Sequence, residues 1–337
     1  MFYHVSTQCS MHPSDRHARP IVVMKFGGTA TGSVERMRAI GALVKEAHND
    51  VRPVLVVSAL AGVTRQLDRG LQAVVAARES SDAAVETALD VFLDDLTTRH
   101  RTQAREVLSS ESAERYASDL ADHIDALRTR MIDVANTGFT PTLRDAVLAT
   151  GEQLSVPMVT ATLRDCGIAA HAGEATTLIH TDDTHGEANV NMTATEAGVT
   201  EWFGTLPPES VPVVAGFIGS STHGATTTLG FEGSDYTAAL IASFLNAASL
   251  TRCTDVDGIY TADPRTDAAA QRLDRLTMEQ AFAWTESGRL GMHPKTLRPL
   301  AHRAVPMQVR SIDRPEAPGT QIVPEGAPDI AFWPPVA

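Results

Sequence analysis

The sequence has few cysteines, and no two of them lie close together. Cys9, Cys166 and Cys253 are widely separated among 337 residues, so it offers neither a CxxC motif nor a disulfide framework. This usage is typical of a reducing compartment, and we expect a cytoplasmic protein. No apolar run approaches the roughly 20 residues that a membrane helix requires. We therefore expect no membrane partner.

Aromatic residues and positive charge are also scarce. Aromatics make up 5% of the chain, whereas 43% of it is hydrophobic, mostly Ala, Val and Leu. That composition is typical of a soluble α/β protein. The formal net charge of −13 argues against nucleic acid as the main partner, although a local basic pocket remains compatible with it. We expect a small-molecule ligand.

Short hydrophobic segments alternate with helical patterns along most of the chain. This alternation predicts an α/β fold in which a mostly parallel sheet is covered by helices on both faces. Residues 1–20 are polar and predict a disordered tail. Residues 21–323 form the predicted main domain, and 324–337 a C-terminal tail. Within the domain, residues 67–140 have almost no glycine or proline and predict a helical subdomain. The expected strands are 21–26, 54–58, 167–172, 211–217, 249–254 and 305–309.

Gly27 and Gly28 lie between the expected strand 21–26 and a helical pattern over 33–47. A strand, glycine turn and helix in succession bring backbone N–H groups against phosphate. Lys25 adds a positive charge at the end of the strand. Neither GxxxxGK[ST] nor GxGxxG is present, so the sequence supports neither a Walker A loop nor a dinucleotide fingerprint.

A second loop of this type, residues 226–237, contains Gly230 and Gly233 and leads into an apolar helical pattern. Glycine permits backbone turns that other residues resist. Ser234 or Asp235 is expected to be the N-cap of the following helix. A helix N-terminus of this kind favours a bound anion.

Other polar residues follow predicted elements. Ser58 and Thr64 come after the expected strand 54–58, where open α/β sheets bind ligands. Glu152 is expected to open a helix, where the helix dipole alone would favour it, so a structural role is an equal alternative. The acidic loop 255–265 is suited to a nucleotide, with Tyr260 on the base and Arg265 on phosphate.

Together these segments resemble the catalytic domain of aspartate kinases, within the amino-acid kinase superfamily. The matching segments keep the order and spacing of that family from residue 21 to about 323. They are KFGGTATGS (25–33), VVSALAGVT (56–64), TGEQLS (150–155), TDDTHGEA (181–188), VPVVAGFIG (211–219), TTTLGFEGSDYTAA (226–239), TDVDGIYTADPR (254–265) and HPKTL (293–297).

The resemblance implies a three-layer α/β/α sandwich with a mainly parallel central sheet, the amino-acid kinase fold. It also implies that MgATP phosphorylates the side-chain carboxylate of L-aspartate to give 4-phospho-L-aspartate. The cofactors are then ATP and Mg²⁺, with the metal held mainly by the ATP phosphates rather than by protein ligands. Kinase domains of this superfamily often form homodimers, which we expect here.

The resemblance also assigns roles to individual residues. Lys25 and Asp235 would be catalytic, with Lys25 holding the transferring phosphoryl group. The substrate-binding residues would be Ser58, Thr64, Glu152, Phe231 and Ser234, with Glu152 binding the ammonium group. The ATP-binding residues would be Lys25, Gly27, Gly28, Thr254, Asp255, Tyr260, Arg265 and Arg289.

The chain departs from the family pattern at three points. The family has Leu-Gly-Arg-Gly-Gly-Ser-Asp in the second glycine loop, where its arginine pairs with the α-carboxylate of aspartate; here Phe231 and Glu232 replace Arg-Gly. Leu290 stands where the family has a lysine at the ATP phosphates, for which Arg289 or Lys295 would have to substitute. The chain also stops where ACT regulatory domains usually begin, so we expect neither an ACT domain nor feedback inhibition through one.

Two alternatives remain beside an aspartate kinase. The first is a kinase of the same fold for a different amino or carboxylic acid, because Phe231 removes the partner of the α-carboxylate. The second is a catalytically weak binding or regulatory homologue. Retention of Lys25, Glu152 and Asp235 favours a working kinase.

Overall fold

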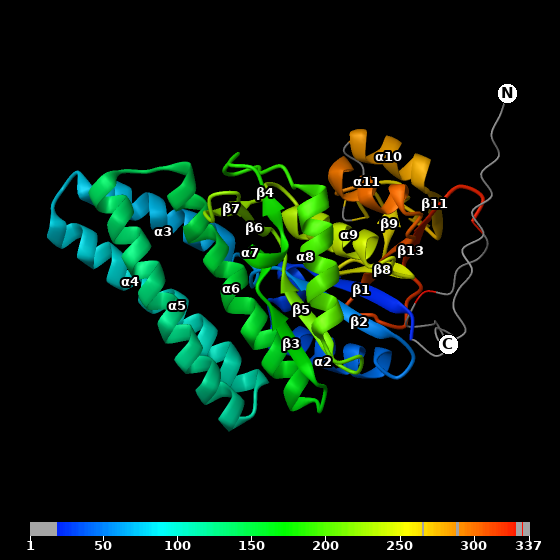
Figure 1. Ribbon diagram of the computed structural model, residues 1–337, viewed down its shortest axis with the longest axis horizontal. Coiled ribbons are helices and arrows are strands. Elements are labelled where there is room, and N and C mark those ends of the chain that lie inside the picture. Colours follow the sequence, from blue (N-terminus) through cyan, green and yellow to red (C-terminus); the bar gives the residue numbers. More distant parts are fainter. Residues whose placement is uncertain (1–18, 265, 288–289, 328–331, 333–337) are drawn as a thin grey trace.

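The computed structural model describes residues 19–264, 266–287, 290–327 and 332. In this part of the chain an eight-stranded sheet has the order β11-β13-β12-β8-β1-β2-β5-β3 (Figure 1). Every neighbouring pair is parallel except β12 with β13. The predicted mainly parallel sheet is therefore confirmed. Its strands are β1 (Ile21–Phe26), β2 (Arg52–Val57), β3 (Ala170–Gly173), β5 (Val211–Ala215), β8 (Ser249–Thr254), β11 (Arg275–Thr277), β12 (Met307–Ser311) and β13 (Thr320–Val323).

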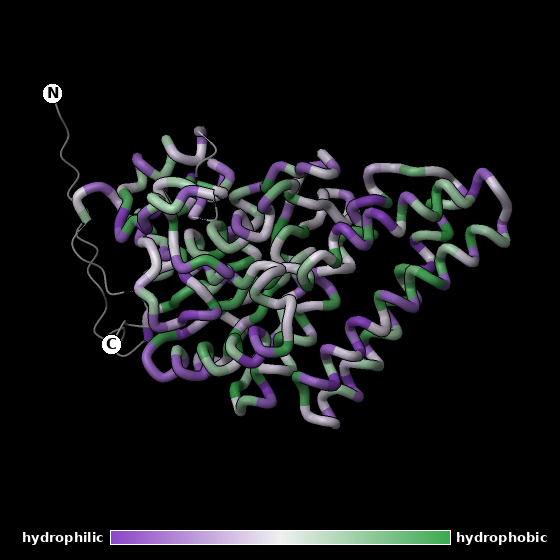
Figure 2. Tube along the Cα trace, turned by 180° about the vertical axis from the view of Figure 1, so that it is seen from behind, coloured by the Kyte–Doolittle hydropathy of each residue, from purple (hydrophilic) through white to green (hydrophobic). Residues whose placement is uncertain are grey.

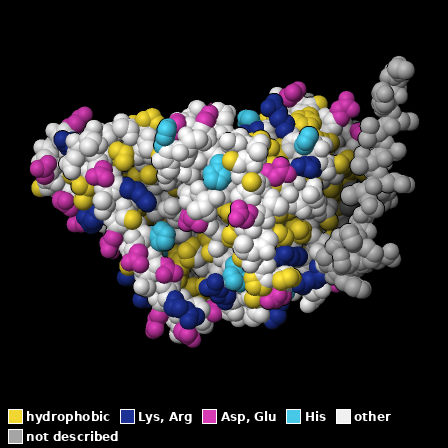
Figure 3. Space-filling view, viewed as in Figure 1, with side chains coloured by type: hydrophobic (Ala, Val, Ile, Leu, Met, Phe, Trp, Pro, Cys, Tyr) yellow, Lys and Arg dark blue, Asp and Glu magenta, His cyan; other side chains and the backbone are white. Residues whose placement is uncertain are grey.

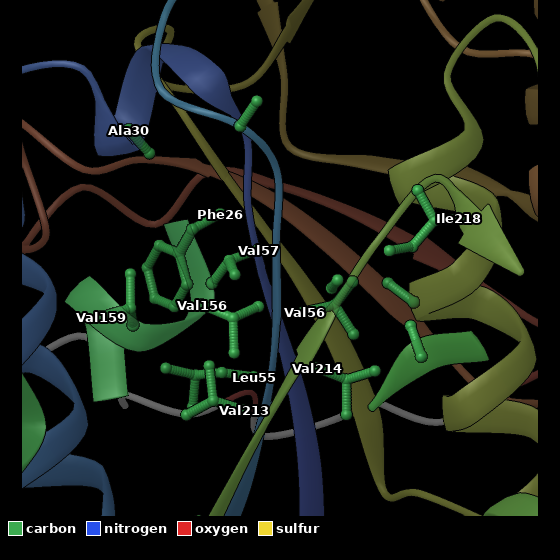
Figure 4. Close-up of a cluster of buried hydrophobic side chains, with 14 of the residues drawn as sticks. Phe26, Ala30, Leu55, Val56, Val57, Val156, Val159, Val213, Val214 and Ile218 are labelled. Carbon is green, nitrogen blue, oxygen red and sulfur yellow. The ribbon is translucent and has the colours of Figure 1, made fainter. Parts of the chain in front are cut away.

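Helices cover both faces of the sheet. Because successive strand residues point to opposite faces, Phe26 packs near Val156 of α6 (Pro141–Asp165) (Figure 4). Lys25 instead is bonded to Asp235 of α9 (Gly233–Phe244). Helix α2 (Val34–Ala47) packs beside α6, and α8 (Met192–Thr205) and α11 (Pro294–His302) pack on α9. Helix α10 (Met278–Glu286) contacts α11. These layers form the α/β/α sandwich.

The long helices α3 (Val63–Arg78), α4 (Asp82–Val107) and α5 (Ser110–Thr137) pack together with α6 and project from one end of the sheet (Figure 1). Hydrophilic and hydrophobic segments alternate along them (Figure 2), as amphipathic helices require. Ser81, Ser109 and Thr140 each accept a backbone hydrogen bond as N-caps. The stretch 67–140 predicted to be helical thus contains most of α3 and all of α4 and α5, and its first helix begins at Val63, slightly earlier than expected.

Several predicted boundaries are wrong by a few residues. The expected strand 167–172 is β3, which begins only at Ala170 because Gly167 adopts a positive φ of 82° in the turn after α6. The expected strand 211–217 ends at Ala215, since Phe217 adopts a φ of 69°. The expected strand 305–309 is β12, which begins at Met307, and β13 (Thr320–Val323) follows it without having been predicted.

The smaller elements flank the sheet. Strands β4 (His180–Thr181), β6 (Ile218–Ser221) and β7 (Thr226–Thr228) form a three-stranded sheet, and β9 (Ile259–Tyr260) pairs with β10 (Arg272–Leu273). The short helices are α1 (Gly28–Thr31) and α7 (Ala175–Leu178).

Acidic and basic side chains are interspersed over the face shown in Figure 3.

None of the helices in the described ranges combines the length and the apolar character that crossing a bilayer requires.

Candidate active site

A cavity of about 540 Å³ lies at the carboxyl ends of β1 and β2. Helices α6 and α9 approach it from opposite faces of the sheet. It gathers eight of the residues predicted from the sequence: Lys25, Gly28, Ser58, Thr64, Glu152, Phe231, Ser234 and Asp235. A larger cavity of about 1200 Å³ lies between α3 and α4. Because none of these eight residues lines that one, we assign the chemistry to the smaller cavity.

Lys25 and Asp235 line the cavity, and Arg252 bonds to Asp235 from outside that lining. The ammonium of Lys25 lies 2.9 Å from Oδ1 of Asp235, and Nε of Arg252 donates to the same oxygen at 3.2 Å. Burial alone would raise the pKa of Asp235, but Arg252 and Lys25 outweigh it and hold that pKa below its ordinary value. Asp235 is therefore ionised at neutral pH, and its Oδ1 contacts both the Lys25 ammonium and the Arg252 guanidinium.

In the sequence, Arg252 is distinguished by its position near the end of the expected buried strand 249–254. In the parallel register of β1 and β8, Arg252 stands opposite Lys25. Our prediction missed it, because a single arginine in a strand gives no indication of which strand lies beside it.

The prediction that Ser234 or Asp235 is the N-cap of α9 is wrong. The N-cap is Glu232, in a left-handed conformation with a φ of 57°, and no side chain caps the helix there. Ser234 and Asp235 are buried in the first turn. The Asp235 carboxylate is held by the two cations, and Cβ and Oγ of Ser234 press against Gly216.

Glu152 also differs from its prediction. It does not open a helix but lies in the middle of α6, because Thr140 caps the helix and Pro141 occupies its first turn. Gly151 beside it has no room for a side chain, since a Cβ there would lie 2.8 Å from Cβ of Ala59. The helix dipole therefore does not account for Glu152.

Burial raises the pKa of Glu152 to about 8, against the opposing effects of the Ala59 amide and Lys25. Its Oε2 is buried with no hydrogen-bond partner among the described residues. A buried carboxyl oxygen without a partner makes the group costly to ionise. Glu152 is thus ready to accept a cation or a hydrogen-bond donor from a ligand.

Replacing Glu152 by glutamine is expected to stabilise the free protein at alkaline pH. Ionisation of Glu152 is harder in the folded state than in the unfolded state, so wild-type stability falls relative to E152Q as pH rises from 4.5 to about 8. The difference is on the order of a few kcal/mol above pH 8 and vanishes below pH 4.5. Thermal unfolding at pH 5 and pH 9 measures it, with the exposed Glu79→Gln as control. An equal effect of E152Q at both pH values would contradict the raised pKa.

Gly27 and Gly28 lie against the Lys25 ammonium and the strand-end loop. A Cβ at Gly27 would lie 3.2 Å from Nζ of Lys25, and one at Gly28 would lie 3.1 Å from the Ala59 carbonyl oxygen. The short helix α1 begins at Gly28, and a helix supplies no acceptor for its first amides. The two glycines thus allow close packing of this turn on the Lys25 ammonium and on the loop at Ala59.

The predicted nucleotide loop lies after β8, outside the lining of the cavity. Thr254 donates to Asp255 at 3.0 Å, and the hydroxyl of Tyr260 donates to Asp257 at 2.6 Å. Arg265 and Arg289, both predicted to bind phosphate, lie outside the described residues.

The structure describes the three residues that depart from the family pattern, Phe231, Glu232 and Leu290. Phe231 lines the cavity and is 76% exposed. The carboxylate of Glu232 accepts a hydrogen bond from the backbone amide of His293. Leu290 is buried. Lys295, one of the two proposed substitutes, donates to the carbonyl oxygen of Leu229 at 2.5 Å and does not line the cavity.

The chain was compared with protein families and with curated proteins. The sequence profile of the Amino acid kinase family matches residues 20–311. The chain is 32% identical over 309 residues to the lysine-sensitive aspartokinase 3 of Escherichia coli strain K12, covering 90% of this chain and 64% of that protein. It is 30% identical over 307 residues to the chloroplastic bifunctional aspartokinase/homoserine dehydrogenase 1 of Zea mays, covering 90% of this chain and 32% of that protein. The chain therefore spans about a third of the length of the bifunctional relative.

Solved structures agree with these similarities. E. coli aspartokinase III in complex with aspartate and ADP matches with a TM-score of 0.80 at 30% identity, covering 91% of this chain and 65% of that chain. The aspartate kinase of Clostridium acetobutylicum, 19% identical, shares the fold with a TM-score of 0.71. The predicted resemblance is confirmed: the parallel sheet, the cavity at its carboxyl edge and these matches agree that the chain belongs to the amino acid kinase family.

Proposed function

We propose that this chain transfers the γ-phosphoryl group of MgATP to a carboxylate of an amino acid, with the side-chain carboxylate of L-aspartate as the preferred acceptor. The observation that carries the proposal is the pairing of Lys25 and Arg252 on Asp235 across one cavity from the unpaired Glu152. The two cations are suited to binding phosphate. The buried carboxyl group of Glu152 is suited to binding an ammonium group.

Transfer to a carboxylate needs little acid–base help, because the nucleophile is already ionised at neutral pH. It needs two anions held in line and their developing charge neutralised. Lys25 would bind the transferring phosphoryl group, with Gly27 and Gly28 beside it. Asp235 would hold the ammonium of Lys25 in place. Ser58, Thr64 and Ser234 would orient the acceptor.

Glu152 would bind the ammonium group of the substrate. A positive charge at the buried Oε2 would favour the ionised form, which burial otherwise opposes. Binding of the substrate would then release a proton from Glu152 below about pH 8. Affinity for the amino acid should consequently rise with pH up to that value.

The residues fit MgATP as a substrate. Lys25 supplies a cation, and the backbone of Gly27 lies directly beside its ammonium. Among the described residues no three His, Cys, Asp or Glu side chains gather into a metal site. We propose that Mg²⁺ is held mainly by the ATP phosphates, where it would neutralise their charge. Thr254, Asp255 and Tyr260 remain the proposed nucleotide contacts. The domain limits 21–323 and a homodimer stay predictions.

Trapping the acyl phosphate with hydroxylamine tests the proposal. We expect MgATP-dependent hydroxamate from L-aspartate and none from L-asparagine, which lacks the side-chain carboxylate. ADP release from L-aspartate without hydroxamate would contradict a carboxylate acceptor. Absence of product from every acid tried would favour the catalytically weak homologue.

The exposure of Phe231 in the cavity supports one other candidate. A kinase for an acid that lacks a free α-carboxylate would need no cation at position 231. L-Aspartate α-amide tests it directly, because this compound keeps the ammonium and the side-chain carboxylate. Turnover of the α-amide with little turnover of L-aspartate would favour this candidate.

A further inference from the structure

Arg144 lies on α6 eight residues before Glu152 and lines the same cavity. Among the described residues of that lining, Lys25 and Arg144 are the ones with cationic side chains. Lys25 is already bonded to Asp235. Arg144 is thus the lining cation that is not bonded to Asp235.

An ion pair with Asp68 orients the guanidinium of Arg144 but uses only some of its N–H donors. Its Nε and Nη2 both approach Oδ1 of Asp68, at 3.0 and 2.9 Å, while Oδ2 of Asp68 accepts from Gln72 at 3.1 Å. A guanidinium has five N–H donors in a fixed fork. No hydrogen bond joins Nη1 to a described residue, so this edge can take a second carboxylate, and the side chain is 37% exposed.

The neighbouring residue fixes this turn of α6. Asp145 is fully buried and accepts hydrogen bonds from Oγ1 of Thr228 at 2.6 Å, from the amide of Gly186 at 2.9 Å and from Nδ1 of His185 at 3.0 Å. Gly186 and Thr228 also line the cavity. Arg144 is consequently presented from a rigid element that is bonded to the cavity wall.

We propose that Arg144 binds the second carboxylate of the acceptor, the one that is not phosphorylated. Position 231 offers no cation, because Phe231 is exposed and apolar. Eight residues of helix rise about 12 Å, so Glu152 and Arg144 would contact the substrate at two points along α6. This inference rests on the proposed function and names its substrate class as an amino diacid with both carboxylates free.

The test compares Arg144→Gln with Arg128→Gln. Arg128 also pairs with acidic residues, Glu86 and Asp90, but does not line the cavity. We expect R144Q to raise the KM for L-aspartate by about 10- to 100-fold, as loss of a charged hydrogen bond predicts. The KM for MgATP should stay within about twofold, and R128Q should change neither value. Arg144→Lys should recover part of the loss.

Asp68→Asn separates binding from a structural role of the ion pair. D68N keeps the guanidinium and frees it from its resident partner, so the KM for L-aspartate should stay the same or fall. A rise in KM as large as that of R144Q would overturn the inference. So would an unchanged KM for L-aspartate in R144Q, or a wild-type preference for the α-amide.

Calorimetric titration of L-aspartate distinguishes failure of the inference from failure of the proposed function. If wild type binds L-aspartate more tightly than R144Q but forms no hydroxamate, the proposed reaction fails and the role of Arg144 stands. If both bind equally while wild type forms hydroxamate, the reaction stands and the inference fails.

Discussion

Replacing Lys25 by methionine is expected to lower kcat for hydroxamate formation about 1000-fold. Preorganised cations and donors at the transferring group commonly contribute 10²–10³-fold each. The side chain of Lys25 is only 9% exposed and its ammonium is fixed 2.9 Å from Asp235. No reorganisation would be needed as charge develops on the phosphoryl group, so loss of this one charge should reduce the rate steeply.

The K25M protein should still fold, because Arg252 continues to neutralise Asp235. Circular dichroism and thermal unfolding check this, and calorimetry should detect a smaller loss in MgATP affinity than in kcat. Lys45→Met is the matched control, since Lys45 lies exposed in the last turn of α2. Retention of more than a tenth of wild-type kcat in K25M would contradict the assigned role.

The sequence was sufficient to predict the elements whose causes are local. Strand β1 is a short apolar run ending at a glycine turn, and β8 was predicted with its observed bounds. The motif residues of the cavity could also be predicted, because their segments keep the family order. Lys25 and Asp235 were each recognisable from the residues beside them.

Features that depend on contacts between distant segments could not be predicted. The role of Arg252 follows from its position opposite Lys25 in the register of β8 and β1. The guanidinium of Arg144 is oriented by Asp68 of α3, which is 76 residues away in the chain. Glu152 was expected at a helix start, but tertiary packing carries α6 through Gly151 and past Pro157. Such pairings arise from packing, which local propensity does not encode.

The N-terminus of α9 illustrates the same limit at a single loop. Serine and aspartate are good N-caps, and both occur at the expected place. Burial of Ser234 and the two cations around Asp235 require these side chains inside the first turn instead. Glu232 then becomes the cap in a left-handed conformation, where its carboxylate bonds to the amide of His293 at the start of α11. A tertiary charge cluster has overridden a local preference.

Replacing Asp235 by asparagine should have the second large effect, on stability and turnover together. Asparagine keeps the volume but leaves Lys25 and Arg252 close together without the carboxylate that both of them contact. Removing one partner of a buried charge cluster typically costs about 3–5 kcal/mol. We also expect kcat to fall at least about 100-fold, because Lys25 would lose its fixed position. Urea unfolding and the hydroxamate assay measure the two effects.

The control for D235N is Asp313→Asn. Asp313 makes a two-point contact with Arg36, at 2.8 and 2.6 Å, but its side chain is 44% exposed. An exposed ion pair contributes about 0–1 kcal/mol, so D313N should change stability little. A loss in D313N as large as that in D235N would contradict the importance of burial.

Two further measurements test the cause of the D235N effect. Because the pKa of Asp235 is lowered in the folded state, its contribution to stability is present above 3.8 and is lost as pH falls below that value. The difference between wild type and D235N should therefore persist from pH 7 to pH 4 and shrink in more acidic solution. If repulsion between Lys25 and Arg252 causes the loss, D235N/R252Q should be more stable than D235N. A double variant that is less stable still would show that Arg252 holds this region through other contacts, such as its bond to the Gly291 carbonyl oxygen at 3.4 Å.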